Sequence, residues 1–243
     1  MTREDYAAHQ KKASYGVDAP GFFPFALLGL TVTLTAGISS HRPGPFVGAA
    51  LLVGCVGFFV HTTRRGKFLV WRELIDNLRL QGNERLLDLG CGRGAVLMSA
   101  ARGLTTGQAV GIDIWSRTDQ SGNSARAAQE NSRIEGVQDR VALTTADMTA
   151  LPFQAATFDV VVSNVAIHNI RGLRRRLTAV DEAVRVLRPG GRLLLADLRS
   201  TGAYVNHLES LGMIDVQRRG LGWRMWWGGP WMATHLVAAK KAT

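Results

Sequence analysis

The stretch that most constrains the fold is R-L-L-D-L-G-C-G-R-G-A-V, residues 85–96. Its apolar beginning predicts a strand that is buried on both faces of a sheet, with Asp88 near the end of that strand. Three glycines follow at alternate positions, and a helix-compatible run, residues 95–104, comes next. A strand, a glycine turn and a helix in this order bring backbone N–H groups and a helix N-terminus to a bound cofactor. The three glycines are Gly90, Gly92 and Gly94.

The glycine pattern alone leaves the kind of cofactor open. The letters G-C-G-R-G-A also fit the dinucleotide pattern G-x-G-x-x-G/A, and an ordinary glycine-rich βα turn fits as well. Asp88 stands two residues before the first glycine. A carboxylate at this point accepts hydrogen bonds from a cationic or amino-bearing ligand and repels a pyrophosphate. Asp88 therefore favours the cationic ligand.

Two long apolar segments precede this turn. Residues 21–40 carry no charge, and residues 46–60 form a second apolar run after His41, Arg42 and a Pro-Gly-Pro turn. A bilayer core of about 30 Å needs roughly 20 helical residues, so residues 21–63 predict a transmembrane helical hairpin. A buried core hairpin and a cleaved signal peptide are the alternatives, and the polar 20-residue leader disfavours the signal peptide. The glycines that would allow close helix approach are Gly29, Gly37, Gly48, Gly54 and Gly57.

The charge pattern predicts where this hairpin would lie. The net charge of +10 favours contact with an anionic partner. This partner is either a layer of lipid headgroups, a nucleic acid or an acidic substrate. Only Arg42 lies between the two runs, whereas basic residues flank both outer ends. The positive-inside rule then puts both hairpin ends and the rest of the chain on the cytoplasmic side of the inner cell membrane. The flanking residues are Lys11, Lys12, Arg64, Arg65 and Lys67.

The cysteines and histidines exclude two kinds of site. Cys55 lies in an apolar run and Cys91 in the glycine turn, so no disulfide framework is indicated. No pair of His or Cys has metal-ligand spacing, and we therefore expect no metal site.

Further landmarks follow the glycine turn in order. Residues 109–114 predict a second strand that ends in Asp113, and L-R-P-G-G precedes a later apolar strand. Together with D-L-G-C-G-R-G, these landmarks resemble the class I S-adenosylmethionine-dependent methyltransferases over residues 68 to 243. A dehydrogenase accounts neither for L-R-P-G-G nor for residues 147–153. The remaining landmarks are residues 144–153, 157–164, 186–195 and 232–240.

The resemblance implies a fold and a cofactor. We expect an α/β, Rossmann-like doubly wound sheet of seven strands with the last strand antiparallel, preceded by the two-helix hairpin. The implied cofactor is S-adenosyl-L-methionine. The expected organisation is a cytoplasmic N-terminal segment 1–20, the hairpin 21–63, a linker helix 64–82 and a methyltransferase domain 83–243.

The resemblance also assigns cofactor contacts. The glycine turn forms the floor under the amino acid part of the cofactor, and Asp88 faces its ammonium or sulfonium group. Asp113 takes the ribose hydroxyls, and Asp147 receives the adenine amino group unless it is a helix cap or turn residue. The other implied contacts are Cys91 in the turn, Ile114 or Trp115 on one adenine face, Met148 beside Asp147, and the backbone of Asn164 and Ala166.

The acceptor side is predicted from the segment after the fourth strand. His168 is the best candidate for a base or an orienting hydrogen-bond partner, the alternative being a structural histidine that caps the next helix. The N-P-P-[YF] motif of enzymes that methylate planar amino groups is absent at Asn164, which argues against DNA. The arginines at 171 and 174–176 form a cluster with three alternative roles. They form a solvated helix face, or they contact lipid headgroups, or they bind an acidic acceptor.

Two segments depart from the short family pattern. Residues 115–124 lengthen the loop after the second strand, where loops shape substrate pockets. Residues 220–231 hold four of the six tryptophans. Three roles are open for them: they line an aromatic pocket, they lie at a membrane interface, or they pack in the core. The sequence thus predicts a membrane-anchored methyltransferase acting on O or N of a small, lipophilic or aromatic acceptor. One rival function is an RNA methyltransferase, but the sequence shows no RNA-binding module. The other is a membrane-tethered regulator that binds the cofactor without turnover.

Overall fold

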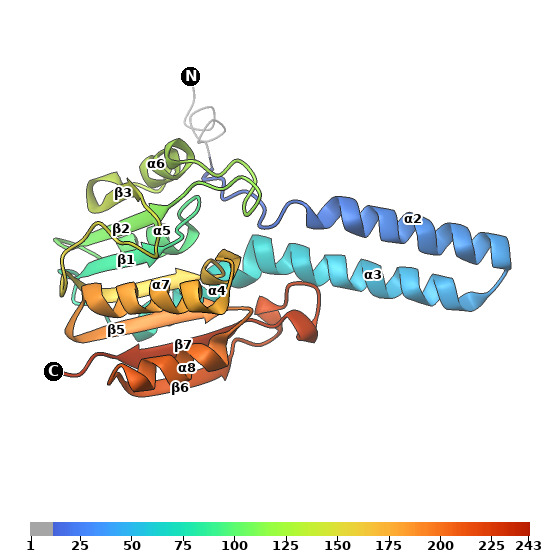
Figure 1. The fold of residues 1–243 in the computed structure, drawn as a ribbon. Coiled ribbons are helices and arrows are strands. Elements are labelled where there is room, and N and C mark those ends of the chain that lie inside the picture. Colours follow the sequence, from blue (N-terminus) through green and yellow to red (C-terminus); the bar gives the residue numbers. More distant parts are fainter. Residues whose placement is uncertain (1–11) are drawn as a thin grey trace, which may run out of the picture.

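The computed structural model describes residues 12–243. Lys11 and most of the predicted segment 1–20 lie outside the described residues. The described chain has two parts, an α/β domain and a long two-helix hairpin that projects from one end of it (Figure 1).

The α/β domain is built on one seven-stranded sheet in the order β3-β2-β1-β4-β5-β7-β6. Neighbouring strands from β3 to β5 are parallel, and β7 is antiparallel to both β5 and β6. This confirms the predicted Rossmann-like sheet with its antiparallel last strand. The strands are β1 Arg85–Leu89, β2 Gln108–Asp113, β3 Val141–Thr145, β4 Phe158–Asn164, β5 Leu187–Asp197, β6 Ile214–Gly220 and β7 His235–Lys240.

Both faces of the central strands are buried, as their continuous apolar sequences predict. Alternate residues of β1 divide between two cores: Leu87 and Leu89 pack with α7 and α8, whereas Leu86 packs with α4 and α5. Helices therefore cover both faces of the sheet (Figure 1). The helices of the domain are α4 Lys67–Asn77, α5 Ala95–Arg102, α6 Ala125–Ile134, α7 Leu173–Val186 and α8 Thr201–Ser210.

The hairpin consists of α2, Phe22–Ser40, and α3, Pro43–His61. The Pro-Gly-Pro sequence was predicted to form the connecting turn. In the structure it instead forms the first turn of α3. Proline suits this position because its missing N–H has no partner in the first helical turn anyway. Gly29 and Gly37 face the partner helix, since an added Cβ would lie 3.1 Å from Leu52 and 2.8 Å from Phe46, respectively. Gly54 and Gly57 have open space and do not serve the approach.

The second hairpin helix does not stop where it meets the domain. It continues through a π-helical turn, η1 (Thr62–Gly66), directly into α4. The helical run from Pro43 to Asn77 thus passes the predicted boundary at residue 63 without a break. Its two halves have opposite surroundings, because α4 packs Trp71 and Leu74 into the core whereas α3 is mostly exposed. A rigid helical connection therefore joins the hairpin to the sheet.

The segment before the hairpin packs onto the domain. Val17 and Ser121 exchange backbone and side-chain hydrogen bonds, and Tyr15 Oη donates to Glu135 at 2.8 Å. Asp18 accepts hydrogen bonds from Thr63 and from the buried Lys67, whose Nζ lies 2.5 Å from its carboxylate. Because Asp18 precedes the hairpin and Lys67 follows it, the two ends of the hairpin lie side by side.

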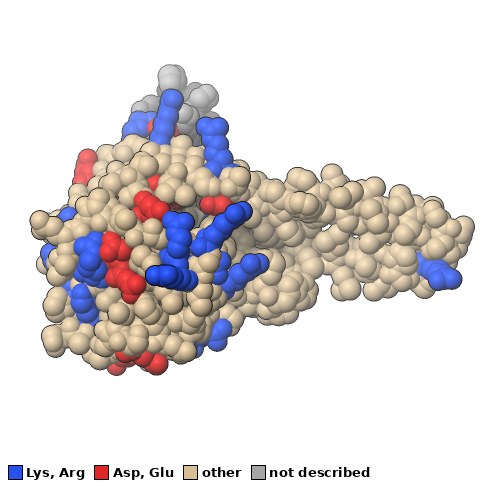
Figure 2. Space-filling model, in the orientation of Figure 1, with Lys and Arg blue, Asp and Glu red and all other residues tan. Residues whose placement is uncertain are grey.

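The hairpin surface is apolar and exposed. Both α2 and α3 are long and apolar enough to cross a membrane by length and composition, and little of either is buried. At about 1.5 Å per residue, each 19-residue helix is about 28 Å long. Figure 2 shows almost no charge along the hairpin apart from one basic side chain at its far end, where Arg42 lies between α2 and α3. Other basic side chains gather on the domain near the hairpin base.

Gly66 tests the contact between the continuous helix and the loop after β6. A Cβ at Gly66 would lie 1.8 Å from the carbonyl oxygen of Arg224, so Gly66→Ala must move backbone against backbone. We expect a loss of about 1–3 kcal/mol in the free energy of unfolding, measured as a lower Tm of the purified protein. Gly202→Ala, in α8 with nothing within 4 Å, is the control and should leave Tm unchanged or higher. An equal Tm for both variants would contradict the close contact.

Candidate functional site

A cavity of about 770 Å³ lies where the parallel strands end. Strand ends of an open parallel sheet form the crevice in which such folds bind ligands. The cavity also faces the hairpin, because Phe59 of α3 and Trp227 after β6 are part of its wall. It therefore joins the glycine turn to the hairpin base.

The glycine turn forms one wall of this cavity. Gly90, Gly92 and Gly94 all have positive φ, of 73°, 52° and 87°, which side chains other than glycine rarely adopt. A Cβ at Gly90 would lie 2.4 Å from the Cβ of Ala166, so the turn after β1 meets the segment after β4 only because no side chain intervenes. Gly90, Cys91 and Gly92 line the cavity, whereas Gly94 does not reach it and instead begins α5.

Asp88 is buried at the end of β1 and faces the cavity. Among the described residues, its Oδ2 has no hydrogen-bond partner. Burial, and next the negative charge of Asp113, raise the pKa of Asp88 to about 8, while a backbone hydrogen bond from Leu97 acts in the opposite direction. A buried carboxyl without a partner is costly, and a cationic ligand would relieve that cost.

Asp113 holds the glycine turn in place. Its Oδ2 accepts the N–H of Gly92 at 2.8 Å, and its Oδ1 accepts the N–H of Trp115 and the side-chain amide of Asn123. Burial raises the pKa of Asp113, although these three hydrogen bonds oppose the shift. The carboxylate lies on the cavity wall, where the sequence placed the ribose hydroxyls.

The structure separates the two candidates for the adenine face. Ile114 is exposed and lines the cavity. Trp115 does not line it; its Nε1 donates to Thr145 at 2.8 Å and its ring packs on the core beside α5. Ile114 is therefore the residue of the pair with access to a ligand.

Asp147 and Met148 lie on the cavity wall, and Asp147 also forms a turn. The carboxylate of Asp147 accepts the N–H and the hydroxyl of Thr149, each at 2.8 Å. These bonds and Arg175 hold the pKa of Asp147 below its usual range. Asp147 thus makes the contacts of a turn residue, which was the alternative to its role at the adenine. Half of its side chain nevertheless remains exposed.

Asn164 and Ala166 also line the cavity. The side-chain oxygen of Asn164 accepts a hydrogen bond from Trp71 Nε1 at 2.8 Å, so that side chain is turned toward α4. The side-chain oxygen of Asn164 is thus already occupied, and the contribution of its backbone to cofactor binding stays a prediction.

His168 forms a pair with Asp197 that the sequence analysis missed. Its Nδ1 lies 2.6 Å from Asp197 Oδ1, and its backbone N–H donates to Asp197 Oδ2 at 3.0 Å. Asp197 is almost fully buried at the end of β5, while His168 is partly exposed and lines the cavity. A polar residue that ends an apolar strand, as Asp197 ends L-L-L-A-D, was the available sequence signal.

Other cavity residues come from segments that the family pattern does not cover. The long loop 115–124 contributes Ser116, Gln120 and Asn123, as expected of a loop that shapes the pocket. Asp18 and Lys67 also line the cavity, and no feature of their local sequence indicated this. Within residues 12–243, no three His, Cys, Asp or Glu side chains are grouped so as to hold a metal ion.

The comparisons with known proteins agree with this geometry. Residues 87–195 match the family model described as a methyltransferase domain. The chain carries a class I S-adenosylmethionine-dependent methyltransferase domain. The cofactor of the methyltransferase domain is S-adenosylmethionine, and Asp88 with its unpartnered oxygen and the glycine cradle fit a cationic ligand of this kind.

Two curated relatives and one solved structure illustrate the similarity. The chain is 37% identical over 127 residues to 27-O-demethylrifamycin SV methyltransferase of Amycolatopsis mediterranei, covering 51% of this chain and 42% of that protein. It is 34% identical over 128 residues to the ubiquinone/menaquinone biosynthesis C-methyltransferase UbiE of Syntrophotalea carbinolica, covering 52% and 49%. The chain thus spans less than half of either relative.

The fold matches geranyl diphosphate C-methyltransferase from Streptomyces coelicolor A3(2), with a TM-score of 0.56 and 16% identity. The match covers 70% of this chain and 75% of that one, and at this identity it shows the fold alone.

The raised pKa of Asp88 predicts a pH-dependent cofactor affinity. Between pH 6 and 7.5 the carboxyl holds its proton, and a bound cation favours the ionised form, so binding releases a proton. The affinity for S-adenosylmethionine should rise with pH over this interval, by at most about tenfold per pH unit. Calorimetry at several pH values in buffers of different ionisation enthalpy measures both the affinity and the released proton.

Asp88→Asn should bind S-adenosylmethionine about tenfold more weakly at pH 7.5 and lose the pH slope, because the amide cannot ionise. Asp76→Asn, on the exposed side of α4, is the control and should keep the wild-type profile. A pH slope that persists in Asp88→Asn would show that another group is responsible.

Proposed function

We propose that the protein is a membrane-anchored S-adenosylmethionine-dependent methyltransferase that transfers a methyl group to O or N of a small lipophilic acceptor. The observation that carries this proposal is a shared cavity. Asp88 and His168 line it, and so do Phe59 of the hairpin and Trp227. Apolar and aromatic walls with a few placed polar groups are typical of sites for small apolar ligands.

The domain has to position an acceptor rather than perform difficult covalent chemistry. Asp88 and the glycine turn would hold the cofactor, which would supply an electrophilic methyl group on a sulfonium. The cavity walls would hold the acceptor beside it, which converts a bimolecular step into a local one. An O–H or N–H acceptor must also lose a proton.

His168 is the group proposed to take that proton. With Nδ1–H donating to Asp197, the other ring nitrogen, Nε2, is left as the acceptor. The second oxygen of Asp197 binds the backbone N–H of His168, so that both the ring and its main chain are held. Arg176 adds a hydrogen bond to the carbonyl of His168 at 2.9 Å. This arrangement supports a positioned base, because orientation by a carboxylate is how catalytic histidines keep one tautomer.

The membrane anchor is proposed from the surface of the hairpin. A soluble core helix buries its apolar side chains, whereas Phe25, Val32 and Leu51 are more than half exposed. A cleaved signal peptide would not continue as one helix into the catalytic core, as α3 does. Contact between Asp18 and Lys67 keeps both hairpin ends on one side of any bilayer. With the positive-inside rule, this supports an inner-membrane protein with its domain in the cytoplasm.

A turnover screen distinguishes an enzyme from a tethered regulator. We expect release of S-adenosylhomocysteine with at least one member of a panel of lipophilic phenols, quinols and amines. His168→Ala should then lower kcat about 10²-fold or more with unchanged affinity for S-adenosylmethionine. Asp197→Asn should lower kcat less, because it misorients the base without removing it.

The matched control for this pair is His207, whose Nε2 lies 2.6 Å from Asp181 away from the cavity. His207→Ala should leave kcat unchanged. Cofactor binding without turnover on any acceptor would favour the regulator. Unchanged kcat in His168→Ala would leave His168 a structural role only.

The anchor is tested by extraction. The wild-type protein should stay with membranes through high-salt and alkaline washes and require detergent for release. Val32→Arg, near the middle of α2, should reduce the inserted fraction, since a central arginine costs about 2.5–3.5 kcal/mol on insertion. Leu211→Arg, at the end of α8, should not. Release of the wild-type protein into plain buffer would refute the anchor.

A further inference from the structure

The loop between β6 and β7, residues 222–233, faces both the cavity and the outside; we refer to it as the doorway loop. It contains two short 3₁₀ turns, η4 (Trp223–Met225) and η5 (Pro230–Met232). Trp227, Trp231 and Met232 line the cavity. Trp231 is 72% exposed and Trp223 53% exposed, which is unusual for the largest apolar side chain.

The doorway loop is held firmly against the hairpin base. Thr62 Oγ1 donates to the carbonyl oxygen of Trp226 at 2.7 Å, and the rings of Phe59 and Trp227 meet edge to face at 5.6 Å. Trp227 Nε1 also donates to Thr234 Oγ1, directly after the loop, at 3.0 Å. The loop that carries the exposed tryptophans is therefore held in place, and its position along the hairpin axis is fixed.

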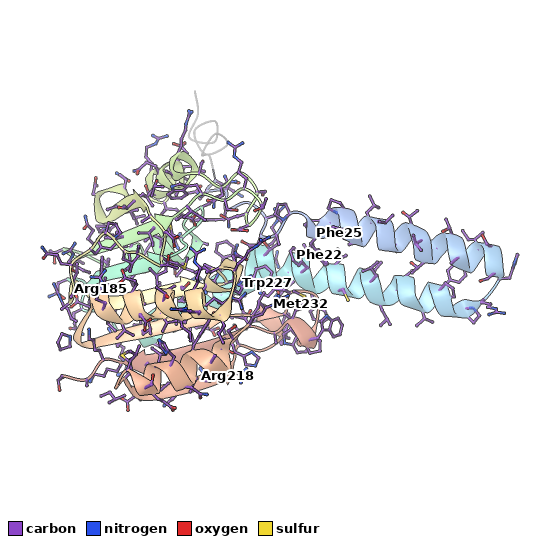
Figure 3. All side chains as sticks on the ribbon, in the orientation of Figure 1. Phe22, Phe25, Arg185, Arg218, Trp227 and Met232 are labelled. Carbon is purple, nitrogen blue, oxygen red and sulfur yellow. The ribbon has the colours of Figure 1, made fainter. Side chains whose placement is uncertain are left out.

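The doorway loop lies at the ends of α2 and α3 that are nearest the domain. Phe22, at the start of α2, stacks on Phe59 at 4.2 Å, and Phe59 in turn contacts Trp227. Figure 3 shows Phe22, Trp227 and Met232 gathered where the hairpin joins the domain, with Phe25 one turn further out along α2. In a bilayer spanned by the hairpin, this level is the membrane interface, where tryptophan is favoured.

The cavity rim carries cations as well as aromatic rings. Arg171 and Arg199 line the same cavity and are exposed, and within residues 12–243 no carboxylate forms an ion pair with either. Arginines at the interface attract anionic headgroups, with a contribution of about 1 kcal/mol for each residue near the surface. Cationic and apolar side chains around one cavity suit the boundary between headgroups and acyl chains.

We infer that the doorway loop inserts into an anionic bilayer surface and that the acceptor enters the cavity sideways from the bilayer, between Phe59 and Trp231. This inference rests on the proposed function and specifies it: the substrate class is an amphiphile that partitions into lipid. Its apolar part passes the aromatic side chains of the doorway loop, and its reactive O–H or N–H group proceeds toward His168. The cofactor reaches Asp88 from the aqueous side.

The first arm of the test measures contact with lipid. The full-length protein is reconstituted in vesicles of phosphatidylcholine and phosphatidylglycerol, with bromines placed either high or low on one acyl chain. Bromines near the headgroup should quench the tryptophan fluorescence more than bromines near the chain end. Trp231→Phe should remove at least a quarter of that shallow quenching. Equal quenching in Trp231→Phe and wild type would overturn the insertion of the loop.

The second arm measures entry, with a 4-dodecylbenzophenone probe dissolved in the vesicles and a benzophenone sulfonate in the water. After illumination, mass spectrometry should find the lipid-soluble probe on the cavity residues Phe59 and Trp227, and the sulfonate should label them at least fivefold less. Trp231→Glu, which puts a charge in the doorway, should lower labelling by the lipid-soluble probe at least fivefold. Leu211→Glu, directly after α8, should not.

The outcomes separate this inference from the proposed function. A protein that inserts its hairpin but shows no Trp231 quenching, or equal cavity labelling by both probes, contradicts the doorway and leaves the anchored methyltransferase intact. A protein that does not associate with vesicles at all contradicts the anchor as well. Labelling of Phe59 that is unaffected by Trp231→Glu would place the entrance elsewhere.

Discussion

One continuous helix, from Pro43 to Asn77, constrains the arrangement of the whole molecule. Its first half has an exposed apolar surface, and its second half packs Trp71 between the sheet and the loop after β6. A helix has no joint at which these halves could reorient freely, so the direction of the hairpin is set by the packing of α4. The π-helical turn at Thr62–Gly66 lets the helix pass against the doorway loop without interrupting it. The cavity therefore has a fixed position relative to the hairpin.

The chemistry of the cavity follows from carboxyl groups at strand ends. Asp88, Asp113 and Asp197 end or nearly end three parallel strands, and each is nearly buried. Two of them are stabilised by the protein itself: Asp113 by backbone and amide N–H groups, and Asp197 by His168. Asp88 lacks such a partner on one oxygen, and burial raises its pKa. The roles proposed above follow this difference, with the cationic donor at Asp88 and the acceptor's proton at His168.

The sequence predicted the sheet, and it named several residues that line the cavity, because both depend on local order. The glycine turn, Asp88 and Asp113 are a few residues from the strands that present them, so alternation and spacing were enough. His168 was proposed because it follows a strand end, but its pairing with Asp197 joins residues 29 apart, one in the turn after β4 and the other at the end of β5. The uninterrupted helix was missed because Arg64, Arg65 and Gly66 read as a polar break, and the role of the tryptophans depended on a contact with a helix about 160 residues earlier. Such contacts have no local signal.

The contact between Asp18 and Lys67 has a consequence for how the molecule is assembled. The chain leaves the domain at Asp18 and returns at Lys67, and Thr63 and Lys67 close this excursion with hydrogen bonds to one carboxylate. The hairpin is thus a loop inserted into an otherwise complete domain, with its two ends already joined. A short turn in its place would connect the same two points. Excision of the hairpin would therefore leave the strand order of the sheet intact, but it would also remove Phe59 from the cavity wall.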